Sequence, residues 1–323
     1  MTPLRLGTRG SALALAQAGQ VAQAVTAAAG RPVELVPVTT RGDTSDLPLE
    51  QLGREATGVF VVAVRRALLT GEVDLVVHSL KDLPTAPADG LTVAAVPPRE
   101  DPRDALCARD GLDLVGLPEG ATVGTGAPRR VAQLRALRPD LTLVPVRGNV
   151  DTRLRRVADG DLDAVVLARA GLARLGRLDA ITEVLDPLQV LPAPGQGALA
   201  VECRTPDPAR SSSADPSADA ALVETLRTLD DPATRAAVEA ERSLLAALEA
   251  GCTAPVGAYA DVGEDPYWEP EVYLRGAVVA IDGSHSVRMS MTGPAADAAG
   301  LGRRLAADLL ADGAADLLGE RVP

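Results

Sequence analysis

The sequence predicts two doubly wound α/β domains followed by a smaller C-terminal α+β domain. Short apolar segments alternate with helical patterns up to the stretch at 205–219, which is typical of βαβ units around a largely parallel sheet. The alternation restarts after residue 97, and this indicates a second block of the same kind. A length of 323 residues is enough for two or three domains.

The first block begins with a strand and an alanine-rich helix. This helix begins at about Ser11, and Gly30 closes it, where a left-handed residue commonly ends a helix. The expected elements, in order, are strand 4–8, helix 11–29, strand 33–38, helix 58–70, strand 73–78 and strand 91–97.

The second block repeats this pattern. Its expected elements are strand 121–125, a helix from 128, strand 142–147, a helix from 149 and strand 163–168. Two connections, near 97–103 and 192–198, join the blocks, so we expect the chain to cross over and return. The first domain is therefore expected to comprise residues 1–97 with 198–227, and the second residues 98–197.

The last part of the chain has a different composition. Residues 205–219 are rich in Pro, Ser, Asp and Ala, which predicts a flexible linker. A helix follows, with Asp231 as its N-cap, Pro232 in its first turn and Gly251 as its C′ residue. Further expected elements are strands near 256–261, 271–281 and 285–292 and a helix near 295–312. Together they predict an α+β domain over residues 228–323.

Composition restricts the classes of function. The chain has no uncharged apolar stretch of about 18 residues and no basic start followed by an apolar run, so we expect a cytoplasmic protein without a membrane span. Three widely spaced cysteines and two histidines favour neither a disulfide framework nor a zinc site. The net charge of −12 argues against nucleic-acid binding.

The positive charge is concentrated in one segment. Residues 121–176 hold ten arginines and five aspartates, so this segment carries +5 and the remainder −17. Because a planar guanidinium binds carboxylate or phosphate with two hydrogen bonds, the cluster indicates a small polyanion as ligand. Arg129 and Arg130 stand in the first turn of a predicted helix and oppose its dipole, a cost that a bound anion would offset. A solvated helix face is the alternative for Arg135, Arg138, Arg155 and Arg156.

Cys252 follows the end of a predicted helix. The negative end of the helix dipole disfavours a thiolate there, so this cysteine is better suited to attachment of a group than to nucleophilic catalysis. The alternative is a small buried residue in a turn.

Seven separated motifs, between residue 4 and about 262, resemble those of the hydroxymethylbilane synthase family, also called porphobilinogen deaminases. They are TRGSALALAQ (8–17), GEVDLVVHSLKDLPT (71–85), REDPRDAL (99–106), GTGAPRR (124–130), VRGNVDTRL (146–154), PAPGQGALAVECR (192–204) and EAGCTAPVGAYA (249–260).

This resemblance implies a transferase of tetrapyrrole and heme biosynthesis. Such an enzyme joins four porphobilinogen molecules head to tail with loss of ammonia and then releases linear hydroxymethylbilane by hydrolysis. The chain grows on a dipyrromethane cofactor held through a thioether, which by motif position falls on Cys252. A monomer that needs no metal is implied. Porphobilinogen carries an acetate and a propionate, in agreement with the arginine cluster.

Asp82 is the implied catalytic residue. Its carboxylate would stabilise positive charge on pyrrole nitrogens and could handle protons, whereas a capping or salt-bridged aspartate is the alternative. Lys81, the only lysine, would offer an ammonium to a carboxylate, with an exposed strand-end lysine as the alternative. Phe60, the only phenylalanine, is either a lid over the pyrrole ring or a core residue.

The remaining contacts are implied by motif position. Those to the cofactor are Ser79, Lys81, Thr125, Arg129, Arg130, Arg153 and Gly197, and those to the substrate are Arg9, Ser11, Gln17, Arg147, Arg174 and Phe60. Gly195, Gln196 and Gly197 match the family's GQG turn, whose implied role is backbone geometry at the crossover. Thr57, Gly126 and Ala127 depart from the family's pattern, so some carboxylates must be held differently.

Two rival functions remain. The α/β domains resemble those of bilobal solute-binding proteins, so a non-catalytic anion-binding protein is the main alternative. That function would require export and would leave Cys252 without a role. A Schiff-base enzyme using Lys81 is less favoured, because Asp82 beside it stabilises the protonated amine.

Overall fold

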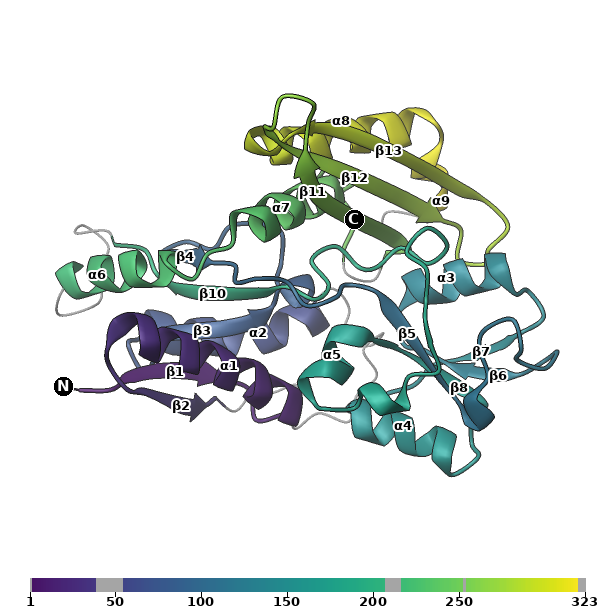
Figure 1. Ribbon diagram of the computed structural model, residues 1–323, viewed down its shortest axis with the longest axis horizontal. Coiled ribbons are helices and arrows are strands. Elements are labelled where there is room, and N and C mark those ends of the chain that lie inside the picture. The colour runs from purple at the N-terminus through teal and green to yellow at the C-terminus, as the bar shows by residue number, and fades with distance from the viewer. Residues whose placement is uncertain (1, 39–54, 207–215, 252–253, 319–323) are drawn as a thin grey trace. The chain divides into compact units, whose positions relative to one another are not determined.

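The computed structural model describes residues 2–38, 55–206, 216–251 and 254–318, with the backbone only at 55–60 and 216. The chain forms two compact units (Figure 1). The N-terminal unit comprises residues 1–99 with 198–235, and the C-terminal unit comprises residues 100–197 with 236–323. The chain passes between the units at 99/100 and 197/198, within or next to the predicted connections, and a third time at 235/236, within the helix Pro232–Ala247.

A five-stranded sheet forms the centre of the N-terminal unit. Its order is β2-β1-β3-β10-β4, in which β10 alone runs antiparallel to its neighbours. The strands are β1 (Leu4–Thr8), β2 (Val33–Pro37), β3 (Leu75–Ser79), β4 (Leu91–Ala95) and β10 (Leu199–Arg204). The helices are α1 (Ala12–Ala29), α2 (Glu55–Leu69) and α6 (Pro216–Arg227), with the 3₁₀ helix η2 (Leu80–Asp82) after β3.

Helices cover both faces of this sheet. Leu6 and Leu75 pack with Val21 of α1 and Leu226 of α6 on one face. On the opposite face Val76 packs with residues of α2. The predicted doubly wound arrangement is therefore confirmed for this unit.

Helix α1 shows how closely local sequence can set an element. The Ser11 hydroxyl accepts the Ala14 N–H at 3.3 Å and so caps the first turn. Gly30 ends the helix with φ 61°, as predicted. Helix α2 begins at Glu55, earlier than the predicted residue 58.

The C-terminal unit contains a second five-stranded sheet, of order β7-β6-β8-β5-β9. Its strands are β5 (Asp104–Ala108), β6 (Thr122–Gly124), β7 (Thr142–Val144), β8 (Ala164–Ala168) and β9 (Glu183–Val184). Its helices are α3 (Pro128–Leu137), α4 (Val150–Ala158) and α5 (Arg169–Arg174), with 3₁₀ turns η3 (Arg109–Gly111) and η4 (Leu178–Ala180). Leu134 of α3 packs on one face of this sheet, and Leu172 of α5 on the other.

Both sheets are largely parallel, as predicted, with one reversed strand each. These strands are β10 and β5, and each follows one of the two predicted connections, near 192–198 and near 97–103. Each sheet thus incorporates, between parallel neighbours, the strand that enters from the other unit.

The predicted C-terminal α+β region is also present. An antiparallel sheet of β11 (Val256–Glu264), β12 (Pro270–Val279) and β13 (Ser286–Pro294) packs against α7 (Pro232–Ala247) and α8 (Ala298–Ala311). The short elements η5 (Ala295–Asp297) and α9 (Ala314–Leu317) complete it. Residues 236–323 belong to the same compact unit as the second sheet, and Leu191 packs with Ala277 and Val279 of β12. The three-domain division remains a prediction.

Two local predictions are wrong. The predicted linker 205–219 includes the start of α6, where Asp219 is buried against Arg204; residues 207–215 lie outside the described ranges. The left-handed residue that ends α7 is Glu249, with φ 51°, rather than Gly251. The Ala250 N–H donates to the Leu245 carbonyl at 3.2 Å, so a glutamate occupies the position that usually favours glycine.

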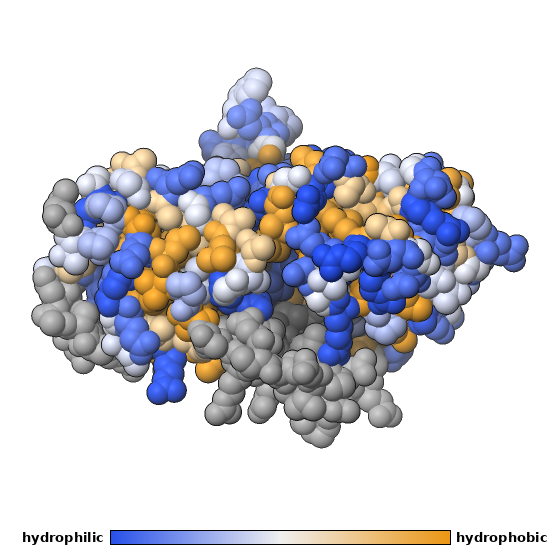
Figure 2. All heavy atoms as spheres, turned by 90° about the horizontal axis from the view of Figure 1, so that it is seen from below, coloured by the Kyte–Doolittle hydropathy of each residue, from blue (hydrophilic) through white to orange (hydrophobic). Residues whose placement is uncertain are grey.

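Two further features concern the distribution of polar residues on the surface and the hydrophobicity of the helices. Hydrophilic and apolar residues are interspersed on the face shown in Figure 2. Within the described ranges, no helix is long and apolar enough to cross a membrane.

Candidate active site

In the N-terminal unit, the predicted site residues lie where two parallel strands end. Strands β1 and β3 are neighbours, so Arg9 and Ser11 after β1 and Ser79 at the end of β3 lie along one edge of the sheet. Gln17 on α1 is buried, and its side-chain amide donates to the Ser79 hydroxyl at 2.9 Å. This bond joins the first helix to the segment that carries Asp82.

Asp82 is presented to solvent on a short turn. It ends η2, in which the buried Leu80 donates its N–H to the Ala198 carbonyl at 3.0 Å and accepts the Leu83 N–H at 3.2 Å. Lys81 is half-buried, whereas Asp82 is exposed. The backbone therefore holds an accessible carboxylate on a fixed support, as a catalytic role requires.

A buried ionic group lies beneath this turn, which the sequence analysis did not identify. His78 on β3 contacts the Glu202 carboxylate of β10 at 3.2 Å, and Arg65 of α2 binds the same carboxylate at 2.7 and 2.9 Å. Burial alone would raise the pKa of Glu202, but His78 and Arg65 outweigh it and the pKa is lowered. The two antiparallel neighbours β3 and β10 are thus tied to α2 by charge.

In the C-terminal unit, the predicted arginine pair is buried and holds a carboxylate of the chain itself. Arg129 and Arg130 are 4% and 5% exposed, and Asp104 at the start of β5 is fully buried. Asp104 lies 2.8 Å from Arg129 Nη1 through Oδ2 and 2.7 Å from Arg130 Nη2 through Oδ1. The anion expected at this helix start is, in this structure, the Asp104 side chain.

The charges of its neighbours affect the pKa of Asp104 more strongly than its burial does. Burial by itself raises the pKa of a carboxyl group, but the positive charges of Arg129 and Arg130 hold the pKa of Asp104 well below its usual value. The group is therefore ionised, and it neutralises one of the two guanidinium charges.

Other predicted cationic residues lie close to this pair. Burial and the charge of Arg130 lower the pKa of Arg153, whose Nε donates to the Gly148 carbonyl at 3.0 Å. Thr125 is buried between β6 and α3, and Arg147 is exposed. A Cβ added at Gly126 would lie 2.9 Å from the Val146 carbonyl oxygen, so the departure from the family pattern there fits a close backbone approach.

Each residue of the GQG turn makes a hydrogen bond to another part of the C-terminal unit. Gln196 is fully buried and donates to Asp104 Oδ1 at 2.8 Å and to the Pro102 carbonyl at 2.7 Å. The Gly195 N–H donates to Glu241 of α7 at 2.6 Å, and Arg174 donates to the Gly197 carbonyl at 2.6 Å. At Gly197, φ is +89° and a methyl group would overlap the Glu100 carbonyl oxygen, so this position requires glycine.

The solvated helix face fits Arg155, whereas Arg135 and Arg138 are half-buried and bind other groups of the chain. Arg138 binds Asp140 at 2.6 Å and the carbonyls of Leu114 and Leu117, and Arg135 donates to the Ile281 carbonyl. Arg155 is exposed and Arg156 is 3.7 Å from Asp161. Cys252 and the side chains of Phe60 and Thr57 lie outside the described residues.

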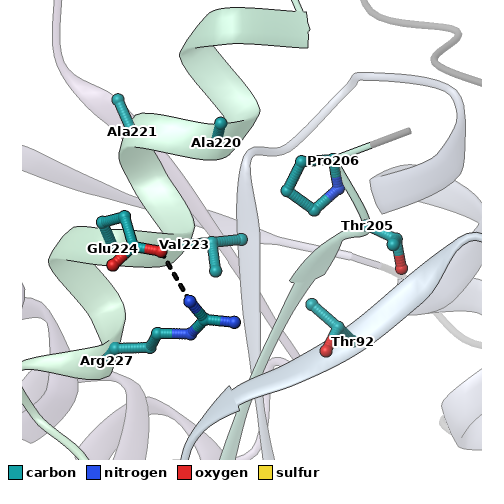
Figure 3. A pocket seen from close by; sticks show the side chains of 8 residues that line it. All are labelled: Thr92, Thr205, Pro206, Ala220, Ala221, Val223, Glu224 and Arg227. Atoms are coloured by element: carbon teal, nitrogen blue, oxygen red, sulfur yellow. Dashed lines mark hydrogen bonds and ion pairs between the residues drawn. The ribbon is translucent and has the colours of Figure 1, made fainter. Parts of the chain in front are cut away.

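One pocket of the N-terminal unit lies apart from the predicted site residues. It has a volume of about 500 Å³ and is lined by Thr92, Thr205, Pro206, Ala220, Ala221, Val223, Glu224 and Arg227 (Figure 3). Its charged residues, Glu224 and Arg227, bind each other at 2.5 Å. Within the described ranges no group of three or more residues is arranged to hold a metal ion.

Comparison with protein families gives two matches. The porphobilinogen deaminase dipyrromethane cofactor binding domain matches residues 4–212, and the porphobilinogen deaminase C-terminal domain matches residues 235–311. Together they account for most of the chain.

Curated relatives match over nearly the whole chain. A porphobilinogen deaminase of Nocardia farcinica is 60% identical, with 99% of this chain and 89% of the relative covered. Porphobilinogen deaminase 1 of Streptomyces coelicolor is 59% identical, with 98% of each covered, and the Mycobacterium tuberculosis protein is 54% identical, also with 98% of each covered.

Solved structures show a weaker likeness. A periplasmic substrate-binding protein of an ABC transporter from Coxiella burnetii covers 69% of this chain, with 91% of its own length covered, at 14% identity and a TM-score of 0.41. An arginine-specific periplasmic binding protein from Salmonella typhimurium covers 71%, with 94% of its length covered, at 13% identity and a TM-score of 0.37. These values are too low to support an argument about function.

Proposed function

Because the chain belongs to the porphobilinogen deaminase family, we propose that it condenses four porphobilinogen molecules head to tail with loss of ammonia. Hydrolysis then releases the linear hydroxymethylbilane. The protein is accordingly a transferase of tetrapyrrole and heme biosynthesis. A non-catalytic anion-binding protein is not favoured by this membership.

The observation that best supports this function is the excess of buried positive charge in the C-terminal unit. Asp104 neutralises one charge of the Arg129–Arg130 pair, and Arg153 adds another beside it. Arg130 Nε is buried and has no acceptor among the described residues, so it can still donate to a bound anion. Since each pyrrole unit carries two carboxylates, the growing chain is the kind of ligand this region suits.

The residues present fit the dipyrromethane cofactor of the family. By motif position, we propose that its carboxylates are held by Arg129, Arg130 and Arg153, with Ser79, Lys81, Thr125 and Gly197 as further contacts. When bound, the group supplies the pyrrole ring on which the chain grows. The buried Arg130 Nε is the donor that supports this fit.

Cys252 is proposed as the thioether attachment. The two described cysteines, Cys107 and Cys203, are buried thiols whose pKa burial raises to about 12, which makes both of them poor attachment points. The position of Cys252 within the family motif then supports its assignment.

Asp82 is proposed as the catalytic residue. Loss of ammonia from porphobilinogen leaves a cationic pyrrole, and a fixed carboxylate beside the ring N–H stabilises that charge and can exchange a proton. The exposed position of Asp82 on the η2 turn supports this role. Arg9, Ser11, Gln17, Arg147, Arg174 and Phe60 are proposed to contact substrate, in a cytoplasmic monomer that binds no nucleic acid.

The direct test is the intact mass of the denatured protein, compared with that of Cys252→Ala. We expect the wild type to carry extra mass equal to two porphobilinogens less the expected ammonia, and the variant to carry none. Cys107→Ala serves as the control and should keep the added mass. A wild-type mass that stays unmodified after incubation with porphobilinogen would exclude the proposed function.

A further inference from the structure

Asp104 is a buried carboxylate that needs polar partners. It is the first residue of β5, pairs with Ala168 at the end of β8, and is fully buried. An isolated carboxylate in such a place would be strongly destabilising, so its partners must offset the loss of hydration. Arg129, Arg130 and Gln196 provide these contacts, at 2.8, 2.7 and 2.8 Å.

The contacts restrict both guanidinium groups. Arg130 donates through Nη1 to the Val166 carbonyl at 3.0 Å and through Nη2 to Asp104, so its plane is fixed at two points. Arg129 donates through Nη1 to the Leu191 carbonyl and lies against the other Asp104 oxygen. The Arg129 contact is short, but Asp104 Oδ2 accepts no well-aligned hydrogen bond, so this contact is an ion pair.

Gln196 in turn fixes the carboxylate. Its amide donates to Asp104 Oδ1 and also to the Pro102 carbonyl, which precedes Asp104 by two residues. A rotation of the Asp104 side chain would break the bonds to Gln196 and Arg130 together. The GQG turn is thereby connected to the arginine pair through one carboxylate.

We propose that Asp104 is a positioning residue, which holds Arg129 and Arg130 so that their remaining N–H groups bind the carboxylates of the growing pyrrole chain. The proposal rests on the proposed function of this site. In this role Asp104 does not touch the ligand and acts through the two arginines. Its negative charge lowers the net positive charge of the site, but its contacts hold both guanidinium groups in place.

The direction in which the affinity for porphobilinogen changes distinguishes a positioning residue from a simple counter-ion. Asp104→Asn removes one negative charge from a site that binds anions. If Asp104 were only a counter-ion, the variant would bind porphobilinogen more tightly, because the local charge becomes more positive. If Asp104 positions the arginines, the variant binds less tightly in spite of the added positive charge.

The matched control is Asp219→Asn in the N-terminal unit. Asp219 is also buried, 4% exposed, and it binds Arg204 at 2.8 Å through an equally internal ion pair. Both variants remove one buried carboxylate from an arginine and both should be less stable than the wild type. Only Asp104→Asn should affect the ligand.

The experiment measures KM and kcat for porphobilinogen, together with the fraction of protein that carries the dipyrromethane mass. We expect Asp104→Asn to raise KM about tenfold or more and to lower the loaded fraction, while Asp219→Asn keeps both within about twofold. A KM that falls or stays unchanged in Asp104→Asn would overturn the proposal. A wild type without cofactor mass or turnover would instead overturn the proposed function.

Gln196→Met provides a second variant in case Asp104→Asn does not fold. It keeps every charge and removes one neutral donor to Asp104, so we expect KM to rise about threefold with kcat less affected. An unchanged KM in this variant, with a stable fold, would contradict the proposed positioning.

Discussion

Each of the two α/β sheets buries ion pairs at its reversed strand, but the net charge of the two groups of residues differs. In the N-terminal unit, Glu202 and Arg204 on the reversed strand β10 pair with Arg65, His78, Asp219 and Asp74. In the C-terminal unit, Asp104 on the reversed strand β5 faces two arginines, and Arg153 lies beside them. The first set is nearly neutral, and the second keeps excess positive charge.

This difference in charge bears on the proposed binding of carboxylates. A buried carboxylate whose charge is balanced by its partners leaves little net charge to attract a ligand. A buried arginine pair that shares one carboxylate remains able to accept further anions. In the proposed function, Asp82 provides an exposed carboxylate, and Arg129 and Arg130 provide buried cations.

The largest expected effect comes from Asp82→Asn, which tests the role assigned to the N-terminal unit. We expect kcat to fall about 10²- to 10⁴-fold, because the carboxylate that stabilises the cationic pyrrole is lost. The cofactor mass and the unfolding midpoint should stay close to those of the wild type, since Asp82 is exposed. Steady-state kinetics measures kcat, intact mass measures the cofactor, and urea unfolding measures the midpoint.

Asp89→Asn is the control for this change, because Asp89 is an exposed aspartate of the same unit. It should keep wild-type turnover. Near-normal product formation by Asp82→Asn would remove Asp82 from its assigned role and leave the arginine pair as the main determinant of activity.

Alanine substitutions at two glycines compare how well each unit tolerates a side chain at a position of positive φ. Gly197→Ala should reduce the free energy of unfolding by more than about 2 kcal/mol, because the methyl group overlaps the Glu100 carbonyl at a positive φ. Gly30→Ala at the end of α1 meets no atom within 4 Å and should cost only about 1 kcal/mol from its left-handed conformation. Urea unfolding of both variants measures the difference; equal losses would show that the crossover turn tolerates a side chain.

Acid unfolding provides the smallest expected effect. The pKa of Asp104 is lowered by its arginines, so below about pH 4 the unfolded chain takes up a proton that the folded protein refuses, and stability falls with falling pH. In Asp104→Asn the slope of unfolding free energy against pH should therefore be shallower by up to about 1.4 kcal/mol per pH unit in this range.

Asp74→Asn in the N-terminal unit should change this slope less. The pKa of Asp74 is also lowered, against the effect of its burial, by Arg5, but the group is only half-buried and solvent weakens the interaction. Urea unfolding between pH 3 and pH 7 compares the two variants. Identical slopes for wild type and Asp104→Asn would show that Asp104 is not the ionised centre of its cluster.

Several features followed from local sequence. The closing Gly30 and the helix starts near Pro128 and Asn149 lie where they were predicted, because each depends on a few neighbouring residues. The end of α7 did not follow, since Glu249 takes the left-handed position in place of Gly251. The helix ends two residues earlier than the position of Gly251 indicates, so the left-handed conformation falls on Glu249.

The sequence by itself determined the alternation of elements, the family motifs and the types of residue that bind carboxylates. It placed Arg129 and Arg130 at a helix start and Asp104 within the motif REDPRDAL, but it could not relate them. Only the tertiary structure brings Asp104, Arg129, Arg130 and Gln196 together, because β5 is inserted as the reversed strand beside β8. Ion pairs between residues 25 or more positions apart depend on strand order and register, which local periodicity does not specify.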